Sequence, residues 1–474
     1  MRLNLKYRYN LKDILWIISN IIVFFFCTFT SIYIFFKTNH SGYEKLFLLP
    51  LVYLICFKFI LSRVLFRELN VFILIFFAIS FSRFVILPFM IVISCYYGGR
   101  SAMPPTHHSY DLALIIMMYE LIVSSIFIYV LDKKERGIFS KNKYLSINKK
   151  NYIYWLFGII IVLISILDIR IIKSFNFIIP KEDAVRSFSD FSIIQSLSVY
   201  GLLITKQIVF VMIAYNLSKK YELTKSKKYI YLVLLVAMMN ILIYFGTNRS
   251  DVIMTAIVSS LTLYKLFGKG VKKGIFILCI VLVVTISGIS AYRSGASISG
   301  NSSKIIDFTD KLQVYLGGPY NVAIAIETKE MFPQANKVEV LLFDIFRPML
   351  GVNMLVKNLP VKYSNMYFNE RIWLSIDRRS QIIPMVGQGN LFFGAMLSPI
   401  LTLIFIRLAY YLNRKIKDCN RVEIFYFLNL SIARMGFMMG QNTMNMINDL
   451  SMNLFLFLII YWINNIVSKI KTYR

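Results

Sequence analysis

Apolar stretches of about 20 residues recur from the N-terminus almost to the C-terminus of this chain. A helix that crosses the hydrocarbon core of a bilayer, about 30 Å thick, needs a stretch of this length. The composition agrees, because 57% of the 474 residues are hydrophobic and only 16% are charged, against about 25% charged in a typical soluble domain. We therefore expect a polytopic membrane protein, and the composition excludes a soluble enzyme, a fibrous protein and a disordered chain.

The expected fold class is all-α, a polytopic transmembrane helix bundle of about 12 spans with one large extracytoplasmic loop. We expect three parts: 1–291 with membrane helices 1–9, 292–390 as the loop with short interfacial helices, and 391–474 with membrane helices 10–12 and a cytoplasmic tail. Within the loop, the semi-apolar stretch 338–356 is expected to form an interfacial or a re-entrant helix. The predicted spans are 14–36, 46–61, 71–97, 111–131, 152–169, 191–217, 229–245, 251–267, 274–291, 391–410, 422–440 and 451–467.

Basic residues indicate the orientation of the predicted helices. The chain carries 53 Lys and Arg against 24 Asp and Glu, a formal net charge of +29. Many of these cations lie in alternate short loops, and short loops rich in Lys and Arg stay on the cytoplasmic side. Both termini are therefore expected in the cytoplasm and the long loop outside, and nucleic acid is not an expected partner. The basic loops are 63–67, 133–150, 219–228, 269–273, 414–421 and the tail 469–474.

Charged residues inside the predicted spans are the first candidates for function, since burying a charge in a membrane is costly. Arg83 and Glu120 fall at similar depth on two consecutive helices, so we expect them to pair. Two interpretations stay open: an ion pair that only holds the helix hairpin together, or part of a proton or substrate pathway. Lys206 and Arg434 are similarly deep, and such scattered positive charge suits an anionic ligand.

The short turn from Gly246 to Asp251 joins two predicted spans on the outer side. In one interpretation it is a tight turn in which Ser250 or Asp251 caps the following helix. In the other, two rigid helices hold Arg249 as a fixed bidentate donor to a phosphate group. An outer arginine is disfavoured by topology unless it has a function, and both interpretations are kept.

The long loop contributes further polar and aromatic candidates. Arg293 follows the end of a predicted span, at headgroup level, and Arg378 lies near the end of the loop. Tyr315 and Tyr320 stand beside glycines, which suits carbohydrate because an aromatic face stacks on sugar C–H groups; an ordinary turn is the alternative. Gly389 lies in the Gly-Gln-Gly-Asn segment at the entry to the next predicted span.

Metal and cofactor motifs are missing from the sequence. His107 and His108 are adjacent but lack a third ligand, so a solvated turn is the preferred interpretation. No phosphate-binding loop, zinc-protease motif or dinucleotide fingerprint is present. We therefore expect neither a metal nor a cofactor, and nucleotide-driven transport is excluded.

Several of these features together resemble the Wzy-type oligosaccharide repeat-unit polymerases, which make O-antigen and capsular polysaccharides. The resemblance rests on about 12 spans with both ends inside, the large outer loop, the turn Gly246-x-x-Arg249, and Arg378 with Gly389 in an Arg-x10-Gly pattern. It implies a membrane glycosyltransferase in the bacterial cytoplasmic (inner) membrane. Its partners would be an undecaprenyl-pyrophosphate-linked oligosaccharide, membrane lipid and a chain-length regulator protein.

The implied reaction assigns roles to the candidate residues. A hydroxyl of one repeat unit attacks the anomeric carbon of another at the outer face of the membrane, and the lipid pyrophosphate departs. Because the leaving group develops negative charge, fixed arginines would stabilise the transition state, and Arg249, Arg293 and Arg378 are the candidates. The substrate-binding candidates are Arg293, Tyr315, Tyr320 and Gly389.

The general base of this reaction must be a carboxylate or a histidine near the outer leaflet. Asp251 is nearest in sequence to Arg249, with Glu327 and Asp377 as rivals. Two other functions stay open. A ligase that moves a finished glycan to another acceptor shares the architecture, although the absence of His from 292–390 favours the polymerase. A lipid-linked oligosaccharide flippase or other transporter would account for the charges inside the spans.

Overall fold

The chain folds into two compact units, each assembled from segments that are far apart in the sequence. Unit 1 comprises Met1–Ile138, Ile298–Tyr410 and Met435–Met446, and unit 2 comprises Phe139–Ser297, Tyr411–Arg434 and Ile447–Arg474. Most of the predicted outer loop thus belongs to the same unit as the first helices and does not form a unit of its own. The computed structural model describes residues 11–67, 70–135, 145–147, 151–181, 191–294, 304–331, 336–356, 358–375 and 380–470.

The expected all-α fold class agrees with the structure, of which about 81% is helical. In the described part of the chain, 8 helical stretches are long and apolar enough to cross a membrane. The predicted spans 251–267 and 274–291 lie in one of these, Arg249–Ser290, and the apolar helices Tyr152–Leu167 and Lys228–Leu242 are shorter. The count of about 12 spans stays a prediction. The 8 stretches are Asp13–Lys37, Leu48–Arg67, Val71–Ser94, His107–Lys134, Ile193–Thr224, Arg249–Ser290, Ala395–Asp418 and Thr443–Lys469.

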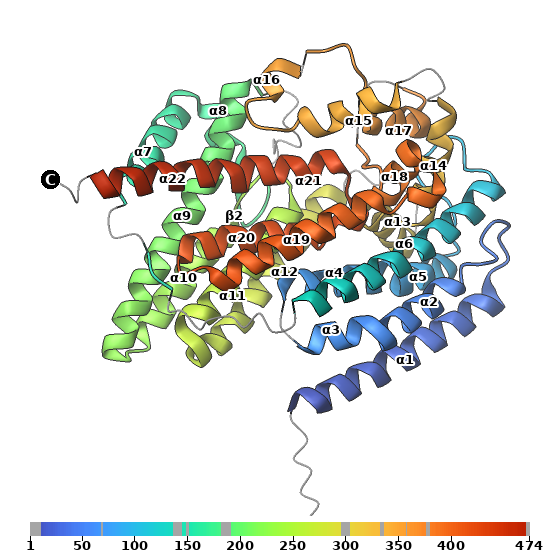
Figure 1. Cartoon of the computed structure of the whole chain (residues 1–474), viewed down its shortest axis with the longest axis horizontal. Coiled ribbons are helices and arrows are strands. Elements are labelled where there is room, and N and C mark those ends of the chain that lie inside the picture. Colours follow the sequence, from blue (N-terminus) through green and yellow to red (C-terminus); the bar gives the residue numbers. More distant parts are fainter. Residues whose placement is uncertain are drawn as a thin grey trace, which may run out of the picture. The chain divides into compact units, whose positions relative to one another are not determined.

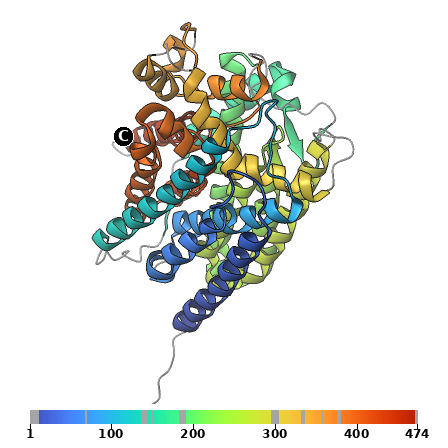
Figure 2. The same ribbon diagram turned by 90° about the vertical axis from the view of Figure 1, so that its right-hand side faces the viewer.

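Unit 1 contains long apolar helices whose first turns are capped by short polar side chains. The Asn70 side chain accepts from the amide of Phe72 at the start of α4, and Thr106 accepts from the amide of Ser109 at the start of α6. Helices α1, α2 and α6 run side by side (Figures 1 and 2). The elements are α1 (Leu11–Lys37), α2 (Leu48–Cys56), η1 (Phe57–Leu61), α3 (Ser62–Arg67), α4 (Val71–Phe81), η2 (Ser82–Ile86), α5 (Leu87–Ser94), α6 (His107–Lys134), α13 (Lys304–Leu316), α14 (Pro319–Thr328), η4 (Lys329–Met331), α15 (Lys337–Phe346), α16 (Asn353–Val356), α17 (Ser364–Trp373), α18 (Met385–Phe393), η5 (Ala395–Leu397) and η6 (Met438–Gly440).

Unit 2 combines long helices with one small sheet. Strands β1 (Phe175–Phe177) and β2 (Ile243–Phe245) pair antiparallel, with Asn176 opposite Tyr244. Because β2 directly follows α10, the sheet ends that helix after Leu242. The helices are α7 (Tyr152–Leu167), α8 (Ile169–Lys173), α9 (Ile193–Thr224), α10 (Lys228–Leu242), α11 (Arg249–Phe267), η3 (Gly268–Val271), α12 (Lys272–Ser294), η7 (Leu450–Phe455) and α22 (Leu456–Ile470), and α19 (Ile400–Asp418), α20 (Val422–Met435) and α21 (Thr443–Asp449) have residues in both units.

Two short helices from the predicted outer loop lie in the core of unit 1. Every residue of α14 except Ile326 is buried, and so is every residue of α18 except Phe393. Helix α14 packs against α6, α17 and α18, and these helices cluster near one end of α6 in Figure 1. We expected interfacial helices here, and α14 and α18 differ from that expectation because they are surrounded by protein.

The turn between α13 and α14 reaches the middle of a candidate span. Gly317 adopts a φ of 60° in this turn, a left-handed conformation that favours glycine. Its carbonyl accepts a hydrogen bond of 3.1 Å from Arg83 Nε, and Arg83 lies halfway along Val71–Ser94. The α13–α14 hairpin is therefore inserted among the long helices of unit 1.

Candidate active site and buried polar networks

Arg434, near the end of α20, bridges two carboxylates from other helices of unit 2. Its Nη2 lies 2.8 Å from Asp251 Oδ1, and its Nε lies 3.1 Å from Asp449 Oδ1. Its Nη1 donates to Ser250 Oγ at 2.6 Å. The side chains of Arg434, Asp251 and Asp449 are 17%, 27% and 8% exposed. This Arg434 cluster (Arg434, Ser250, Asp251 and Asp449) is thus mostly buried, and charge-assisted hydrogen bonds are strong in such surroundings.

The N-terminus of α11 positions two members of the Arg434 cluster and the predicted Arg249. Asn248 is the capping residue, because its Oδ1 accepts from the amide of Ser250. The expectation that Ser250 or Asp251 would cap this helix is therefore wrong. The Nδ2 of Asn248 donates to Asp251 Oδ2 at 2.9 Å, so both oxygens of Asp251 are engaged. Arg249 is the first residue of α11 and is half-buried.

Asp449 differs from Asp251 in having one oxygen that no described residue hydrogen-bonds. Its Oδ1 accepts from Arg434 and, at 2.9 Å, from Asn453 Nδ2. Within the described part of the chain, no hydrogen bond is formed by its Oδ2. Asp449 can therefore accept a proton at Oδ2 without losing a hydrogen bond to any described residue, which makes it the better candidate for a proton acceptor of the two.

Lys206 brings a second cation close to the Arg434 cluster. Its Nζ donates to the carbonyl oxygens of Asn240 and Ile243 at 2.8 and 2.7 Å, where α10 ends and β2 begins. Cations are favoured at such helix C-termini. Lys206 and Asp251 also interact electrostatically. Two cations thus balance the two carboxylates, a neutral arrangement that a low-polarity environment can accommodate.

Arg83 and Glu120 form an ion pair, as expected from their similar depth in two consecutive predicted spans. Arg83 Nη1 lies 2.7 Å from Glu120 Oε2, and both side chains are 0% exposed. Glu120 Oε1 accepts from Thr402 Oγ1 at 2.9 Å. No described residue hydrogen-bonds Arg83 Nη2. Arg83 lies in the π-helical turn η2, and its bond to the Gly317 carbonyl makes this pair the anchor of the α13–α14 hairpin.

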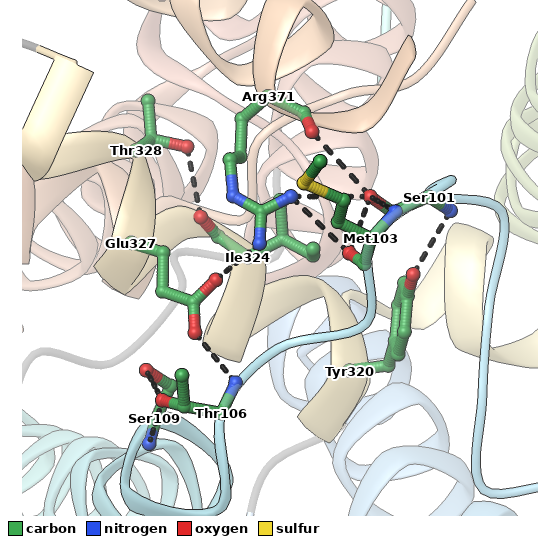
Figure 3. A network of polar contacts seen from close by, with 9 residues as sticks. All are labelled: Ser101, Met103, Thr106, Ser109, Tyr320, Ile324, Glu327, Thr328 and Arg371. Atoms are coloured by element: carbon green, nitrogen blue, oxygen red, sulfur yellow. Dashed lines mark hydrogen bonds and ion pairs between the residues drawn. The ribbon is translucent and has the colours of Figure 1, made fainter. Parts of the chain in front are cut away.

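A second network connects the loop helices α14 and α17 to the turn that precedes α6 (Figure 3). Arg371 forms an ion pair with Glu327 and donates from Nη1 to Ser101 Oγ and the Met103 carbonyl. Glu327 also accepts from the amide of Thr106 at 2.7 Å. Burial alone would raise the pKa of Glu327, but bonds from the Thr106 amide, a serine hydroxyl and Arg371 keep that pKa below its ordinary value. Because both carboxylate oxygens of Glu327 already accept hydrogen bonds, this residue is better placed to hold α14 and α17 together than to act as a general base.

Helix α13 has a comparable anchor. Arg100 donates from Nε and Nη2 to Asp310 Oδ2 at 2.9 and 2.7 Å. Tyr96 extends the contact, with its hydroxyl 3.5 Å from Asp310 Oδ1. Ion pairs at Arg83, Arg100 and Arg371 therefore fix the α13–α14 hairpin and α17 on the long helices of unit 1.

A neutral network surrounds the buried carboxyl group of Asp344. It accepts from the Ser364 amide and hydroxyl, and from Gln388 Nε2 at 2.7 Å. Gln388 also exchanges two hydrogen bonds with Thr443. Burial raises the pKa of Asp344 to about 6. Asp344 lies in the semi-apolar stretch 338–356, for which the sequence predicted only a helix, so this network was missed.

The remaining predicted site residues have different positions. Tyr320 is 1% exposed and its hydroxyl accepts from the Ser101 amide (Figure 3), so its ring has no open face for a sugar. A Cβ on Gly389 would lie 2.0 Å from the Ser398 carbonyl oxygen, so this glycine serves close packing. Both sugar-binding expectations are corrected accordingly. Tyr315 is 45% exposed and stays a prediction.

Two predicted arginines cannot be placed in a site. Arg293 lies in α12, but its side chain is outside the described part of the structure, and Arg378 and Asp377 lie outside the described residues. In the residues that are described, no three His, Cys, Asp or Glu side chains gather as a metal site would require. No protein-family model, curated protein or solved structure matches this chain.

Proposed function

We propose that this chain is a membrane polymerase that joins undecaprenyl-pyrophosphate-linked oligosaccharide repeat units into a cell-surface polysaccharide, an O-antigen or a capsule. The single observation that carries the proposal is the Arg434 cluster beside Arg249 at the N-terminus of α11. It combines a cation for a departing pyrophosphate with carboxylates for an attacking hydroxyl. On the predicted topology this end of α11 faces the outside, where the lipid-linked units would arrive.

In the proposed reaction, Asp449 takes the proton from a hydroxyl of the acceptor unit as its oxygen bonds to the anomeric carbon of the donor unit. The bond from that carbon to the pyrophosphate breaks, and its electron pair leaves with the lipid pyrophosphate. Arg249 stabilises the negative charge on the leaving group. Arg434 orients Asp449 and Asp251 through its two ion pairs. Asp449 replaces Asp251 as the preferred base because no described residue hydrogen-bonds its Oδ2.

Arg249→Ala tests the proposal in cells that make the polysaccharide. We expect the variant protein to reach the membrane while long chains disappear and single-repeat products remain. Arg249→Lys is the matched control: it keeps the charge but loses the bidentate geometry, so intermediate chain lengths are expected. Normal chain lengths in Arg249→Ala would rule out the proposed role of this residue.

A transporter of lipid-linked oligosaccharide is the second candidate, and the fully buried Arg83–Glu120 pair favours it. Transport sites near the membrane midplane are typically built where helices are interrupted. Here Arg83 lies in a π-helical turn and donates a hydrogen bond to the Gly317 carbonyl in the turn between α13 and α14. Transport of a fluorescent lipid-linked oligosaccharide across vesicles by the purified protein would favour this candidate. Glycosidic bond formation in the same vesicles would favour the polymerase. A ligase would transfer the glycan only to a different acceptor.

A further inference from the structure

Helix α15 exposes an apolar face, although it lies outside all of the candidate spans. Val338, Leu342 and Phe346 are 63%, 45% and 40% exposed, and Leu341 and Ile345 between them are half-exposed. These five side chains follow the i, i+3, i+4, i+7, i+8 spacing of a single helix face. In a water-exposed helix this face would carry the polar residues, so α15 has the opposite polarity.

The other face of α15 is firmly attached to unit 1. Val340 and Phe343 are buried, and Asp344 is held by Ser364 and Gln388. The outward direction of the apolar face is therefore fixed by packing and by hydrogen bonds. The exposed apolar face of α15 therefore cannot turn inward without breaking these contacts.

The apolar surface continues beyond α15. Helix α16 packs against α15, and Met354, Leu355 and Leu359 are 60%, 81% and 49% exposed. Contiguous apolar surface of this kind marks a contact with a membrane or with another protein. A 10-residue helix is about 15 Å long and cannot cross a bilayer.

We propose that the α15–α16 surface, formed by the exposed apolar residues of both helices and Leu359, lies in the interfacial layer of the bilayer and contacts lipid acyl chains. Unit 1 contains several candidate spans, so a lipid surface is its nearest apolar phase. Charged residues stand at both ends of α15: Lys337 and Glu339 in the first turn and Arg347 after the last. A charged rim around an apolar helix face matches phospholipid headgroups around acyl chains. The inference does not depend on the proposed function.

Spin labels on single cysteines test this inference in vesicles of phosphatidylethanolamine and phosphatidylglycerol. The labels are placed at Leu342→Cys and Leu355→Cys in a chain whose 5 native cysteines are replaced by alanine. Each variant must elute as a folded protein in detergent. Two labelled positions are used so that the test can still be made if one of the two variants does not fold. Phe25→Cys, at a position in α1 that is 67% exposed, is the lipid control, and Glu330→Cys, at an exposed position in η4, is the water control.

We expect labels at 342 and 355 to be relaxed more by oxygen than by a water-soluble nickel complex, as at Phe25. Greater relaxation by the nickel complex, as at Glu330, would overturn the inference. If both reagents are excluded in vesicles but admitted in dilute detergent, another protein or a second copy of this chain covers the surface, which would also overturn it.

Discussion

Replacing Glu120 by glutamine removes the negative partner of Arg83 while nearly preserving the shape of the side chain. Both side chains are 0% exposed, so the guanidinium would remain buried without its counter-charge. Breaking such a pair by removing one partner costs about 3–5 kcal/mol. Arg83 would keep its bond to the Gly317 carbonyl, and the amide oxygen could still accept from Thr402. We therefore expect a loss of about 3 kcal/mol, roughly a 100-fold change in the ratio of folded to unfolded protein.

A double variant shows whether the loss of stability comes from leaving one charge buried without its partner. Arg83→Met alone should destabilise the protein to a similar extent, because Glu120 is then left charged and buried. Arg83→Met with Glu120→Leu should regain most of the stability, since apolar replacement of a buried pair is often neutral or stabilising. Thermal unfolding of purified protein in detergent, followed by size-exclusion chromatography, measures all four proteins. Single variants as stable as the wild type, or a double variant no better than the singles, would refute the reasoning.

The same double variant also distinguishes the two interpretations of the pair. If Arg83 and Glu120 only hold the α13–α14 hairpin in place, a stable double variant should still produce long polysaccharide chains. If they take part in transport of protons or substrate, the double variant should fold but lose activity. Chain-length analysis on gels provides this readout.

Further predictions concern the proposed base, the Asp344 network and glycine packing. Asp449→Asn should slow chain extension roughly 100-fold or more, whereas Asp251→Asn, whose carboxylate already has both oxygens engaged, should slow it less; equal effects would contradict the assignment of the base. Because the folded-state pKa of Asp344 is about 6 rather than 3.8, folding favours its protonated form, so wild-type stability should fall by about 2 kcal/mol as pH rises from 4 towards 7. Asp344→Asn should flatten that decline in thermal-unfolding profiles, and an unchanged profile would argue against the raised pKa. Gly389→Ala, whose Cβ would lie 2.0 Å from the Ser398 carbonyl oxygen, should cost about 1–3 kcal/mol, while Gly98→Ala, with nothing within 4 Å, should melt like the wild type.

Features that depend on local sequence were predictable. Runs of about 20 apolar residues identified the long helices, and counting residues along two such runs placed Arg83 level with Glu120. Short helices were expected in the predicted outer loop, but the burial of α14 and α18 was not, because each is about half the length needed for a span. Their burial depends on packing against α6 and α17, which are distant in sequence.

The Arg434 cluster shows the same limit. Arg434 and Asp251 were each noticed, but they are separated by 183 residues in the sequence. The spacing of residues along a single sequence does not indicate which carboxylate forms an ion pair with a distant arginine. The choice of Asp251 as the base followed its position beside Arg249. The structure adds the hydrogen bonds that engage both of its oxygens, and it shows that no described residue hydrogen-bonds Asp449 Oδ2. Sequence spacing could not indicate either feature.

The most direct test of the central claim is extension of purified lipid-linked repeat units by the purified protein in vesicles. We expect a ladder of longer lipid-linked products from the wild-type protein, and only the starting single repeats from Arg249→Ala and Asp449→Asn at equal amounts of folded protein. If the wild-type protein leaves the repeat units unjoined, or if both variants produce the full ladder, the proposed polymerase site is contradicted.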